Sequence, residues 1–293
     1  MKPHPWPGDT RCVVFVSVNF DAEAFDLKTT SEDRLYGRFS YGRYGVRAGL
    51  PRLLKMLERR SIAATAFVTA SDATRHPEAI HALRDAGHEI ASRGADLTPL
   101  TELKDKERDA LQEGRDVLAR IAGRPPRGFR APGGELGPRS LALLAELGFA
   151  YDSSFQDDDH PYVIAPTGST RLAELPTVQA LDDSFVFSAR HTHARVMTIW
   201  REEFDALYRE NCLVPLTLHL RGDVGSTRAA RIAALEELLA YMASRPGVRF
   251  MTGGQLADLA LASTASAEDD PLAPHAATLA VTPYRGDLAV KPI

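Results

Sequence analysis

Short apolar runs alternate along the chain with segments that have helical periodicity. Residues 12–18 (CVVFVSV) are almost continuously apolar, which is typical of a strand buried on both faces. Four leucines between 50 and 57 follow the i, i+3, i+4, i+7 spacing of one helix face, which predicts a helix at about 49–60. The run IAATAFV at 62–68 predicts the next strand. This strand–helix–strand order predicts an α/β fold.

The alternation continues to about residue 252 and predicts seven to eight strands in all. We expect the further strands at 88–92, 128–131, 149–153, 172–178, 213–220 and 248–252. We expect helices at about 77–87, 101–122, 138–148, 200–210 and 227–244, several of them opened by proline and ended by glycine. This pattern fits an irregular (β/α) barrel, in which chemistry lies on the loops at the carboxyl ends of the strands.

The barrel is predicted to occupy residues 1–262 as one domain, because a chain of 293 residues can bury a single large core. From about residue 263 the helical periodicity is lost, and proline, alanine and aspartate become frequent. Residues 263–293 are therefore predicted to form a C-terminal tail. It is either disordered or an arm that lies on a neighbouring subunit, so homo-oligomerisation through the tail is left open.

Composition and charge narrow the function classes. A net charge of -4 gives no reason to expect nucleic acid or an anionic membrane surface as a partner. The chain has no apolar run of the roughly 20 residues that span a bilayer, and its first residues lack the apolar region of a secretory signal. Cys12 and Cys212 are interpreted as reduced core thiols, although a disulfide between them is left open. We expect a cytoplasmic enzyme that acts on a small molecule.

Polar and charged residues gather where five of the predicted strands end. The five segments are 19–23 (NFDAE), 92–97 (SRGADL), 130–134 (RAPGG), 151–162 (YDSSFQDDDHPY) and 218–221 (LHLR). Because the carboxyl ends of parallel strands meet at one edge of a sheet, we expect these segments to form a single site.

The order of several strings resembles one family. The strings are VNFDAEAF, YGVRAGLPRLLKML, ATAFVTA, HPEAIHALRDAGHEIASRG, GFRAPGGELGP, LLAELGFAYDSSF, DDDHPY, ELPTVQALDD and LTLHL. Together they resemble the NodB-homology polysaccharide deacetylases, in particular an intracellular branch with peptidoglycan deacetylase-like and cyclic-imide hydrolase proteins. The resemblance covers about residues 12–260. It implies a NodB-type barrel and a hydrolase.

The resemblance also implies roles for individual positions. In the family, an Asp-x-Asp after the first strand supplies a general base and a metal ligand, and these positions are Asn19 and Asp21 here. A His-x-x-x-His after the third strand supplies two more ligands, and these are Arg93 and Leu97 here. The family's base-orienting arginine matches Arg130.

The late-strand histidine of the family, which acts as an acid or stabilises an oxyanion, matches His219. We therefore expect no metal. A catalytic zinc needs three protein ligands, and only one remains. A guanidinium about 4 Å from a dication would also cost on the order of 8 kcal/mol at an effective dielectric near 20.

The candidate residues divide into catalytic and substrate-binding groups. Asp21, Glu23, Arg130 and His219 are the predicted catalytic residues, and the two carboxylates share a face if the strand period persists. His219 is the leading acid or base because histidine titrates near neutral pH. Asn19, Arg93, Tyr162 and Asp183 are predicted to bind substrate, and either Asp182 or Asp183 is expected to orient His219. Arg93 is expected to hold a carboxylate or oxyanion through its planar fork.

Three functions remain open at this point. The leading hypothesis is a metal-independent hydrolase of a non-peptide C–N bond in a small amide, imide or ureide. The second is a barrel repurposed for non-hydrolytic chemistry such as cyclisation, dehydration or isomerisation, because the residues that activate water are replaced. The third is a non-catalytic binding protein, since fold does not imply activity.

Overall fold

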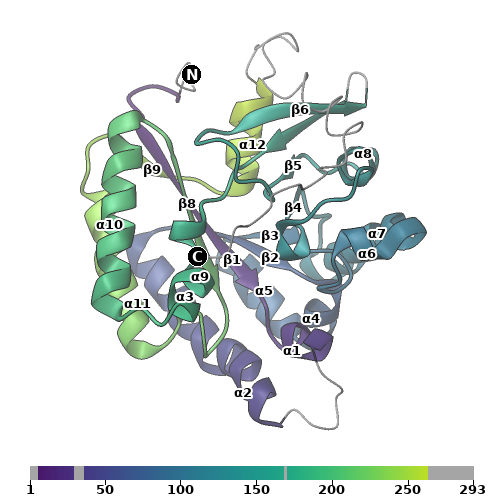
Figure 1. The fold of residues 1–293 in the computed structure, drawn as a ribbon, viewed down its shortest axis with the longest axis horizontal. Coiled ribbons are helices and arrows are strands. Elements are labelled where there is room, and N and C mark those ends of the chain that lie inside the picture. The colour runs from purple at the N-terminus through teal and green to yellow at the C-terminus, as the bar shows by residue number, and fades with distance from the viewer. Residues whose placement is uncertain (1–5, 30–35, 168–169, 263–293) are drawn as a thin grey trace, which may run out of the picture.

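The computed structural model describes residues 6–29, 36–167 and 170–262, so the predicted tail 263–293 lies outside the described residues. A curled, mostly parallel sheet runs through the middle of the molecule, with helices on its outer side (Figure 1). Its strand order is β6-β7-β5-β4-β3-β2-β1-β8, and β9 pairs with the start of β1. The predicted irregular barrel is confirmed, as a half-barrel whose path ends at β6 and β8.

The strands of the sheet are short except for the two that carry most of the site. They are β1 Cys12–Phe20, β2 Thr65–Val68, β3 Glu89–Ser92, β4 Gly128–Phe129, β5 Tyr151–Asp152, β6 Tyr162–Thr167, β7 Thr170–Glu174, β8 Leu213–His219 and β9 Val248–Phe250. All pairs are parallel except the β6–β7 hairpin.

The helices cover the convex side of the sheet and the loops around it. The α-helices are α1 Ala24–Thr29, α2 Tyr36–Tyr44, α3 Leu50–Arg60, α4 Ala70–Arg75, α5 Pro77–Asp85, α6 Leu100–Leu103, α7 Glu107–Ala122, α8 Ser140–Glu146, α9 Asp183–Ser188, α10 His193–Glu210, α11 Ala229–Ala243 and α12 Gly253–Ala262. Short 3-10 turns are η3 Lys104–Lys106, η4 Pro132–Gly134 and η5 Gln179–Leu181, and η2 Gly45–Gly49 is a π-turn.

Strand β1 is buried along its whole length, and its two faces differ in chemistry. Its even-numbered residues pack against the outer helices in one large apolar cluster. Its odd-numbered residues begin with Val13 and Phe15, which lie in a second cluster on the concave side. Because side chains alternate along a strand, Ser17 and Asn19 continue this concave face. The concave face is therefore apolar at its amino end and polar at its carboxyl end.

Strand β8 pairs with β1 in parallel, so its polar residues lie beside those of β1. Ser17 pairs with Thr217 and Asn19 pairs with His219 in the parallel ladder. The side chains of both pairs are hydrogen-bonded across the strands, at 3.2 Å for the hydroxyls and 3.0 Å for the amide and ring. The register of two strands whose paired residues are 200 positions apart thus brings Asn19 and His219 together.

The side chain of Tyr151 on the neighbouring strand packs directly over Gly128 of β4. A Cβ atom at this position would lie 1.9 Å from the ring of Tyr151, which fills the concave core there. Any side chain would displace that ring, so glycine is required. This close packing fixes the start of the segment that carries Arg130.

Most predicted elements are present, with two differences. The helix predicted at 101–122 is broken at Lys104, which has a positive φ of 51°, so it divides into α6, η3 and α7. Strand β6 and the helices α1, α2, α4, α9 and α12 were not predicted. The cysteines are free and buried as expected, and burial raises the pKa of Cys12 to about 12.

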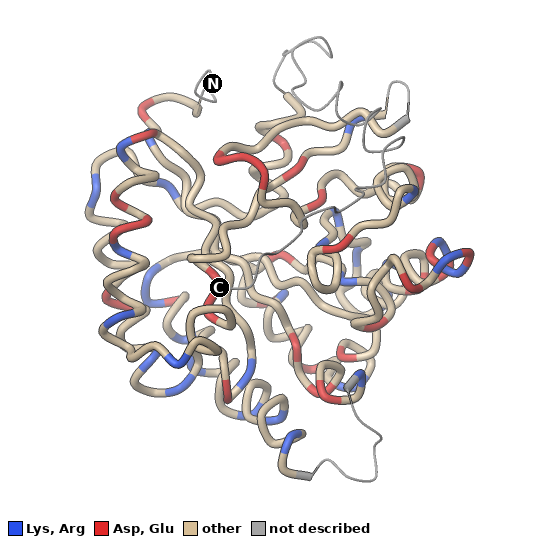
Figure 2. Tube along the Cα trace, in the orientation of Figure 1, with Lys and Arg blue, Asp and Glu red and all other residues tan. Residues whose placement is uncertain are grey.

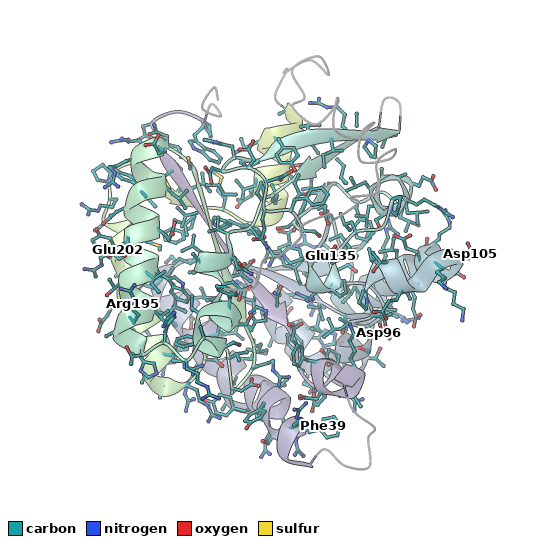
Figure 3. All side chains as sticks on the ribbon, in the orientation of Figure 1. Phe39, Asp96, Asp105, Glu135, Arg195 and Glu202 are labelled. Carbon is teal, nitrogen blue, oxygen red and sulfur yellow. The ribbon has the colours of Figure 1, made fainter. Side chains whose placement is uncertain are left out.

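Charged residues lie mainly on the outer helices and loops, while the central strands carry few (Figure 2). Exposed Arg195 and Glu202 on α10 and Asp105 beside α7 point outward at the periphery (Figure 3). Within the described ranges, no helix combines the length and apolar character that a membrane crossing requires.

Candidate active site

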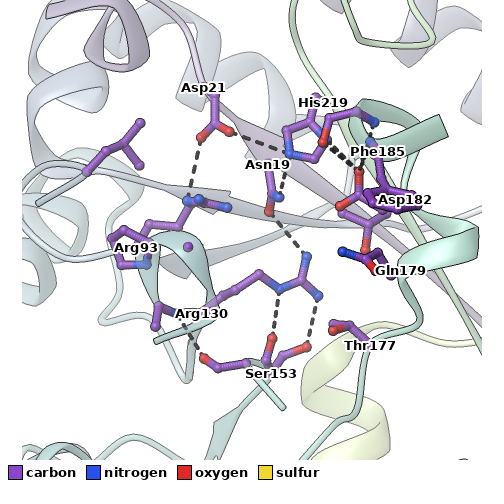
Figure 4. A pocket seen from close by; sticks show the side chains of 18 of the residues that line it. Asn19, Asp21, Arg93, Arg130, Ser153, Thr177, Gln179, Asp182, Phe185 and His219 are labelled. Atoms are coloured by element: carbon purple, nitrogen blue, oxygen red, sulfur yellow. Dashed lines mark hydrogen bonds and ion pairs between the residues drawn. The ribbon is translucent and has the colours of Figure 1, made fainter. Parts of the chain in front are cut away.

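A cavity of about 600 Å³ opens at the carboxyl ends of the strands. Its polar residues come from β1 and β8 and from the segments that follow β1, β3, β4, β5 and β7 (Figure 4). They include Asn19, Asp21, Arg93, Arg130, Ser153, Ser154, Thr177, Gln179, Asp182, Thr217 and His219. All five predicted strand-end segments therefore contribute directly to one cavity.

Asn19 is held between a cation and the histidine ring. Nη1 of Arg130 donates to Oδ1 of Asn19 at 3.2 Å, and Nδ2 of Asn19 lies 3.0 Å from Nε2 of His219. Because the guanidinium only donates, it fixes the amide with its oxygen toward Arg130 and its N–H toward His219. Nε2 must then accept, so this network assigns an unprotonated Nε2 to His219.

Asp183 supports His219 from behind. Its Oδ1 accepts from Nδ1 of the ring and from the backbone N–H of His219, both at 2.9 Å, and its Oδ2 accepts from the N–H of Ser226 at 2.7 Å. Asp183 is fully buried and does not line the cavity. It therefore orients the ring, as predicted for one of the two aspartates, and does not face the ligand.

The pKa of His219 reflects a balance of opposing effects. Burial lowers the pKa, but the hydrogen bond to Asp183 and the charges of Asp182, Asp183 and Asp21 outweigh burial, so the pKa lies above its usual value. The N–H of Asn19 acts in the opposite sense, because it bonds only to the neutral ring. The imidazolium is thus well stabilised once a proton arrives, whereas the N–H of Asn19 occupies the lone pair of Nε2 beforehand.

Asp21 lies between His219 and Arg93. Its Oδ2 is 3.7 Å from Nε2 of His219, and its Oδ1 is 3.5 Å from Nε of Arg93 (Figure 4). Both side chains of the Asp21–Arg93 pair are more than nine-tenths buried. Oδ1 of Asp21 and Nε and Nη1 of Arg93 nonetheless have no hydrogen-bond partner among the described residues. Unmet polar groups in a buried position are costly, which points to a ligand that would satisfy them.

The loop that carries Asp21 is fixed by a buried carboxyl group below it. Asp72 accepts from the backbone N–H groups of Ala22 and Ala24, each at 3.1 Å. Burial raises the pKa of Asp72 to about 7, and the charges of Asp21 and Glu23 add to the rise, although the two N–H groups oppose it. Asp72 was not predicted, and its position in an ordinary ASDA string gives no local signal of this role.

Arg130 acts mainly as a positioning residue. Besides Asn19, it donates to Oγ of Ser17 at 2.9 Å, to the carbonyl of Ser153 at 2.9 Å and to Oγ of Ser153 at 2.8 Å. Its guanidinium also lies 4.1 Å from the centroid of the Phe67 ring. Burial and the charge of Arg93 lower its pKa to about 10, so it remains a cation at neutral pH. With four N–H bonds already made, it has little left to offer a ligand.

Three predicted site residues do not line the cavity: Asp183, predicted to bind substrate, together with Glu23 and Tyr162. Glu23 does not share a face with Asp21, because the strand ends at Phe20 and Glu23 turns to His76, with 2.6 Å between Oε2 and Nε2. Tyr162 on β6 donates to Asp157 at 2.8 Å and does not line the cavity. Ser153, Thr177 and Phe185 do line it but were not predicted. Of these three, only Ser153 could have been found from the sequence, because it belongs to the YDSS segment at a predicted strand end.

The residues at the family's metal positions do not fit a metal. Of the three family metal positions, only Asp21 has a side chain that can bind a metal. The second position carries the guanidinium of Arg93, which pairs with Asp21, and the third carries the apolar Leu97, which also lines the cavity. A second group, Asp182, Asp183 and His219, places three ligand atoms within 4.8 Å of one another. These acceptors are already used, since Asp183 binds His219 and Ser226, and Asp182 caps α9. Neither set of residues therefore leaves enough unoccupied ligand atoms to bind a metal ion.

The fold and this strand-end site define a NodB-type α/β hydrolase, and comparison with known proteins identifies the family. The family model described as polysaccharide deacetylase matches residues 28–151. A solved Mycobacterium smegmatis protein assigned to the polysaccharide deacetylases is 36% identical, with a TM-score of 0.82 over 89% of this chain and 93% of that one. The chain therefore belongs to the polysaccharide deacetylase family.

Two further relatives differ from each other in what they are named for. Puue allantoinase is 27% identical, with a TM-score of 0.80 over 90% of this chain and 95% of that structure. A peptidoglycan deacetylase of Helicobacter pylori is 26% identical over 84% of this chain and 95% of its own length. The family thus includes relatives named for small-molecule and for polymer chemistry.

Proposed function

We propose that the protein is a metal-independent hydrolase of a non-peptide C–N bond in a small amide, imide or ureide. The observation that carries the proposal is the buried Arg93 guanidinium. Its Nε and Nη1 lack hydrogen-bond partners among the described residues, and it occupies a family metal position beside Asp21, whose other carboxylate oxygen lies 3.7 Å from His219. A guanidinium at this position can polarise a substrate carbonyl group, which is the role that a metal ion would otherwise have.

The chain's own residues supply the remaining steps. Once the N–H of Asn19 is displaced from Nε2 of His219, a water molecule at that nitrogen loses its proton to the ring as its oxygen bonds to the substrate carbonyl carbon. The Asp21–Arg93 pair contacts the substrate, with Arg93 donating to the developing oxyanion and Asp21 accepting a substrate N–H. The imidazolium, held by Asp183 at 2.9 Å, then returns the proton to the nitrogen as the C–N bond breaks.

The pair also suits a cyclic amide. A ring amide presents its C=O and N–H on the same side, so an acceptor and a donor 3.5 Å apart can meet both. An open-chain amide in the trans form directs these groups to opposite sides. The likeness to an allantoinase supports the same choice.

The proposal is tested with a panel of hydantoin, succinimide and an N-acetylglucosamine oligomer, each with and without a strong chelator. We expect turnover of a ring amide that survives chelation and gives a product heavier by one water. Turnover that chelation abolishes and zinc restores would refute metal independence. Exclusive turnover of the sugar oligomer would refute the small substrate.

One observation favours a second function. Asn19 cannot take a proton near neutral pH, and Arg130 and His219 bind both ends of its amide. A site without the family's base would suit isomerisation or dehydration, in which His219 moves a proton within one substrate. A product of unchanged mass, or one lighter by a water, would favour this alternative over hydrolysis.

A further inference from the structure

Two exposed phenylalanines stand at the mouth of the cavity. Among the described residues, three large hydrophobic side chains are exposed: Phe25 at 45%, Tyr41 at 39% and Phe185 at 49%. Phe25 and Phe185 line the cavity, whereas Tyr41 does not. Exposed large apolar residues mark binding surfaces when they gather in one place, so their joint position here requires an explanation.

Charged groups hold the ring of Phe25 and the backbone of Phe185. The guanidinium of Arg221 lies 4.4 Å from the centroid of Phe25, and Arg221 is itself held by Asp26 and Asp223 at 3.1 to 3.2 Å. Phe185 lies in the first turn of α9, where its backbone N–H donates to the capping Asp182 at 3.1 Å. Both residues are therefore fixed in place, although each remains about half exposed.

Other apolar residues line the cavity together with the two rings. They are Leu97, Pro132 and Val178, and each is at least partly buried. Leu97 stands at a family ligand position, so apolar surface reaches the place where chemistry is expected. The cavity therefore combines the charged groups of Asp21 and His219 with apolar lining residues, among them the two rings.

We infer that these apolar lining residues bind a planar or apolar substituent of the substrate, so that the preferred substrate is a small ring amide with an aromatic or bulky alkyl group. The inference rests on the proposed function and adds the class of substituent. The reactive C–N bond lies over Asp21, Arg93 and His219, and the substituent extends toward Phe185 and Phe25. Burial of ring surface against an exposed phenylalanine supplies the preference.

The test compares hydantoin with 5-phenylhydantoin, which differ only by the phenyl group. We expect the wild-type protein to favour 5-phenylhydantoin by about tenfold in kcat/KM, which is the scale of one aromatic contact. Phe185→Ala should reduce this ratio to near one, and Phe185→Leu should retain part of it. Tyr41→Ala is the matched control, since it removes an exposed ring outside the cavity, and it should leave the ratio unchanged.

Calorimetric dissociation constants for the same two compounds keep this inference separate from the proposed function. If neither hydantoin is hydrolysed, hydrolysis is refuted, yet a binding preference that depends on Phe185 still supports the apolar subsite. A ratio unaffected by Phe185→Ala in both measurements overturns the inference. Loss of N-acetylglucosamine tetramer binding in Phe185→Ala, with no phenyl preference in the wild type, also overturns it and assigns the rings to a glycan.

Discussion

Nδ2 of Asn19 lies 3.0 Å from Nε2 of His219, while Arg130 binds the other end of the same amide. A carboxylate at position 19 would accept a hydrogen bond from a protonated Nε2, whereas the amide, oriented by Arg130, can only donate one to an unprotonated Nε2. Whether residue 19 is aspartate or asparagine thus determines which protonation state of the His219 ring its neighbour favours.

Asn19→Asp should raise the pKa of His219, because a second acceptor and a negative charge then face Nε2. A base that must be neutral becomes active as the pH rises through its pKa, so the acidic limb of the kcat/KM profile should move to higher pH. Titration of the ring protons by NMR measures the pKa directly. An unchanged or lower pKa would contradict the assigned orientation of the amide.

Arg93→Met should lower kcat by about 100-fold to 1000-fold, because it removes the donor nearest Asp21 that has no other protein partner. Arg93→Lys should recover only part of the loss, since an ammonium lacks the planar fork. Steady-state kinetics with thermal unfolding of each variant separates catalysis from folding. Near-normal kcat in a folded Arg93→Met protein would remove Arg93 from the mechanism.

The double variant Arg93→His with Leu97→His should acquire zinc, because Asp21 then gains two imidazole ligands. Leu97→His alone should not, since the remaining guanidinium would oppose a dication by about 8 kcal/mol at an effective dielectric near 20. Elemental analysis of the dialysed proteins measures this. Equal zinc in the single and double variants would show that Arg93 does not exclude the metal.

Asp72→Asn should flatten the pH dependence of stability. The pKa of Asp72 is raised from 3.8 to about 7 in the folded protein, so the folded state binds this proton more tightly than the unfolded chain. The group therefore contributes stability that is complete below about pH 4 and lost as the pH rises through about 7, by roughly 4 kcal/mol. Urea unfolding of both proteins between pH 4 and 8 measures the difference in slope.

The control for this comparison is Asp9→Asn, whose exposed carboxyl lies far from the loop after β1. Its pKa is lowered by Arg249, so it should not reproduce the change expected between pH 5 and 7. If Asp72→Asn and the wild type lose stability in parallel over that interval, Asp72 is ionised throughout and the loop is held by a charge.

The sequence predicts those parts of the fold that depend on a local pattern. The run that forms β1 and the leucines of α3 are read directly from their periodicity, because burial alone determines them. The site at the strand ends is predicted for the same reason, since parallel strands direct Asn19, Arg93 and His219 to one edge. These predictions need no knowledge of loop geometry.

The remainder depends on contacts that no local pattern records. The break at Lys104 requires a positive φ at a residue that usually avoids it, inside an otherwise helical pattern. Glu23 was expected beside Asp21, but the strand ends before it and His76, more than 50 residues away, binds it. Phe185 entered the cavity through a six-residue helix that has too few turns to show periodicity.

The hydrogen bond between Asp183 and the ring of His219 restricts how that ring can move. One carboxylate accepts from the ring, from the backbone N–H of His219 and from the N–H of Ser226, so the imidazole cannot rotate without losing its bond to a carboxylate that two backbone groups keep in place. A histidine held in this way cannot move its ring to meet substrates of different geometry. The substrate must instead place its reactive bond at Nε2, so the selectivity of the protein should depend on the shape of the substrate more than on movement of the site.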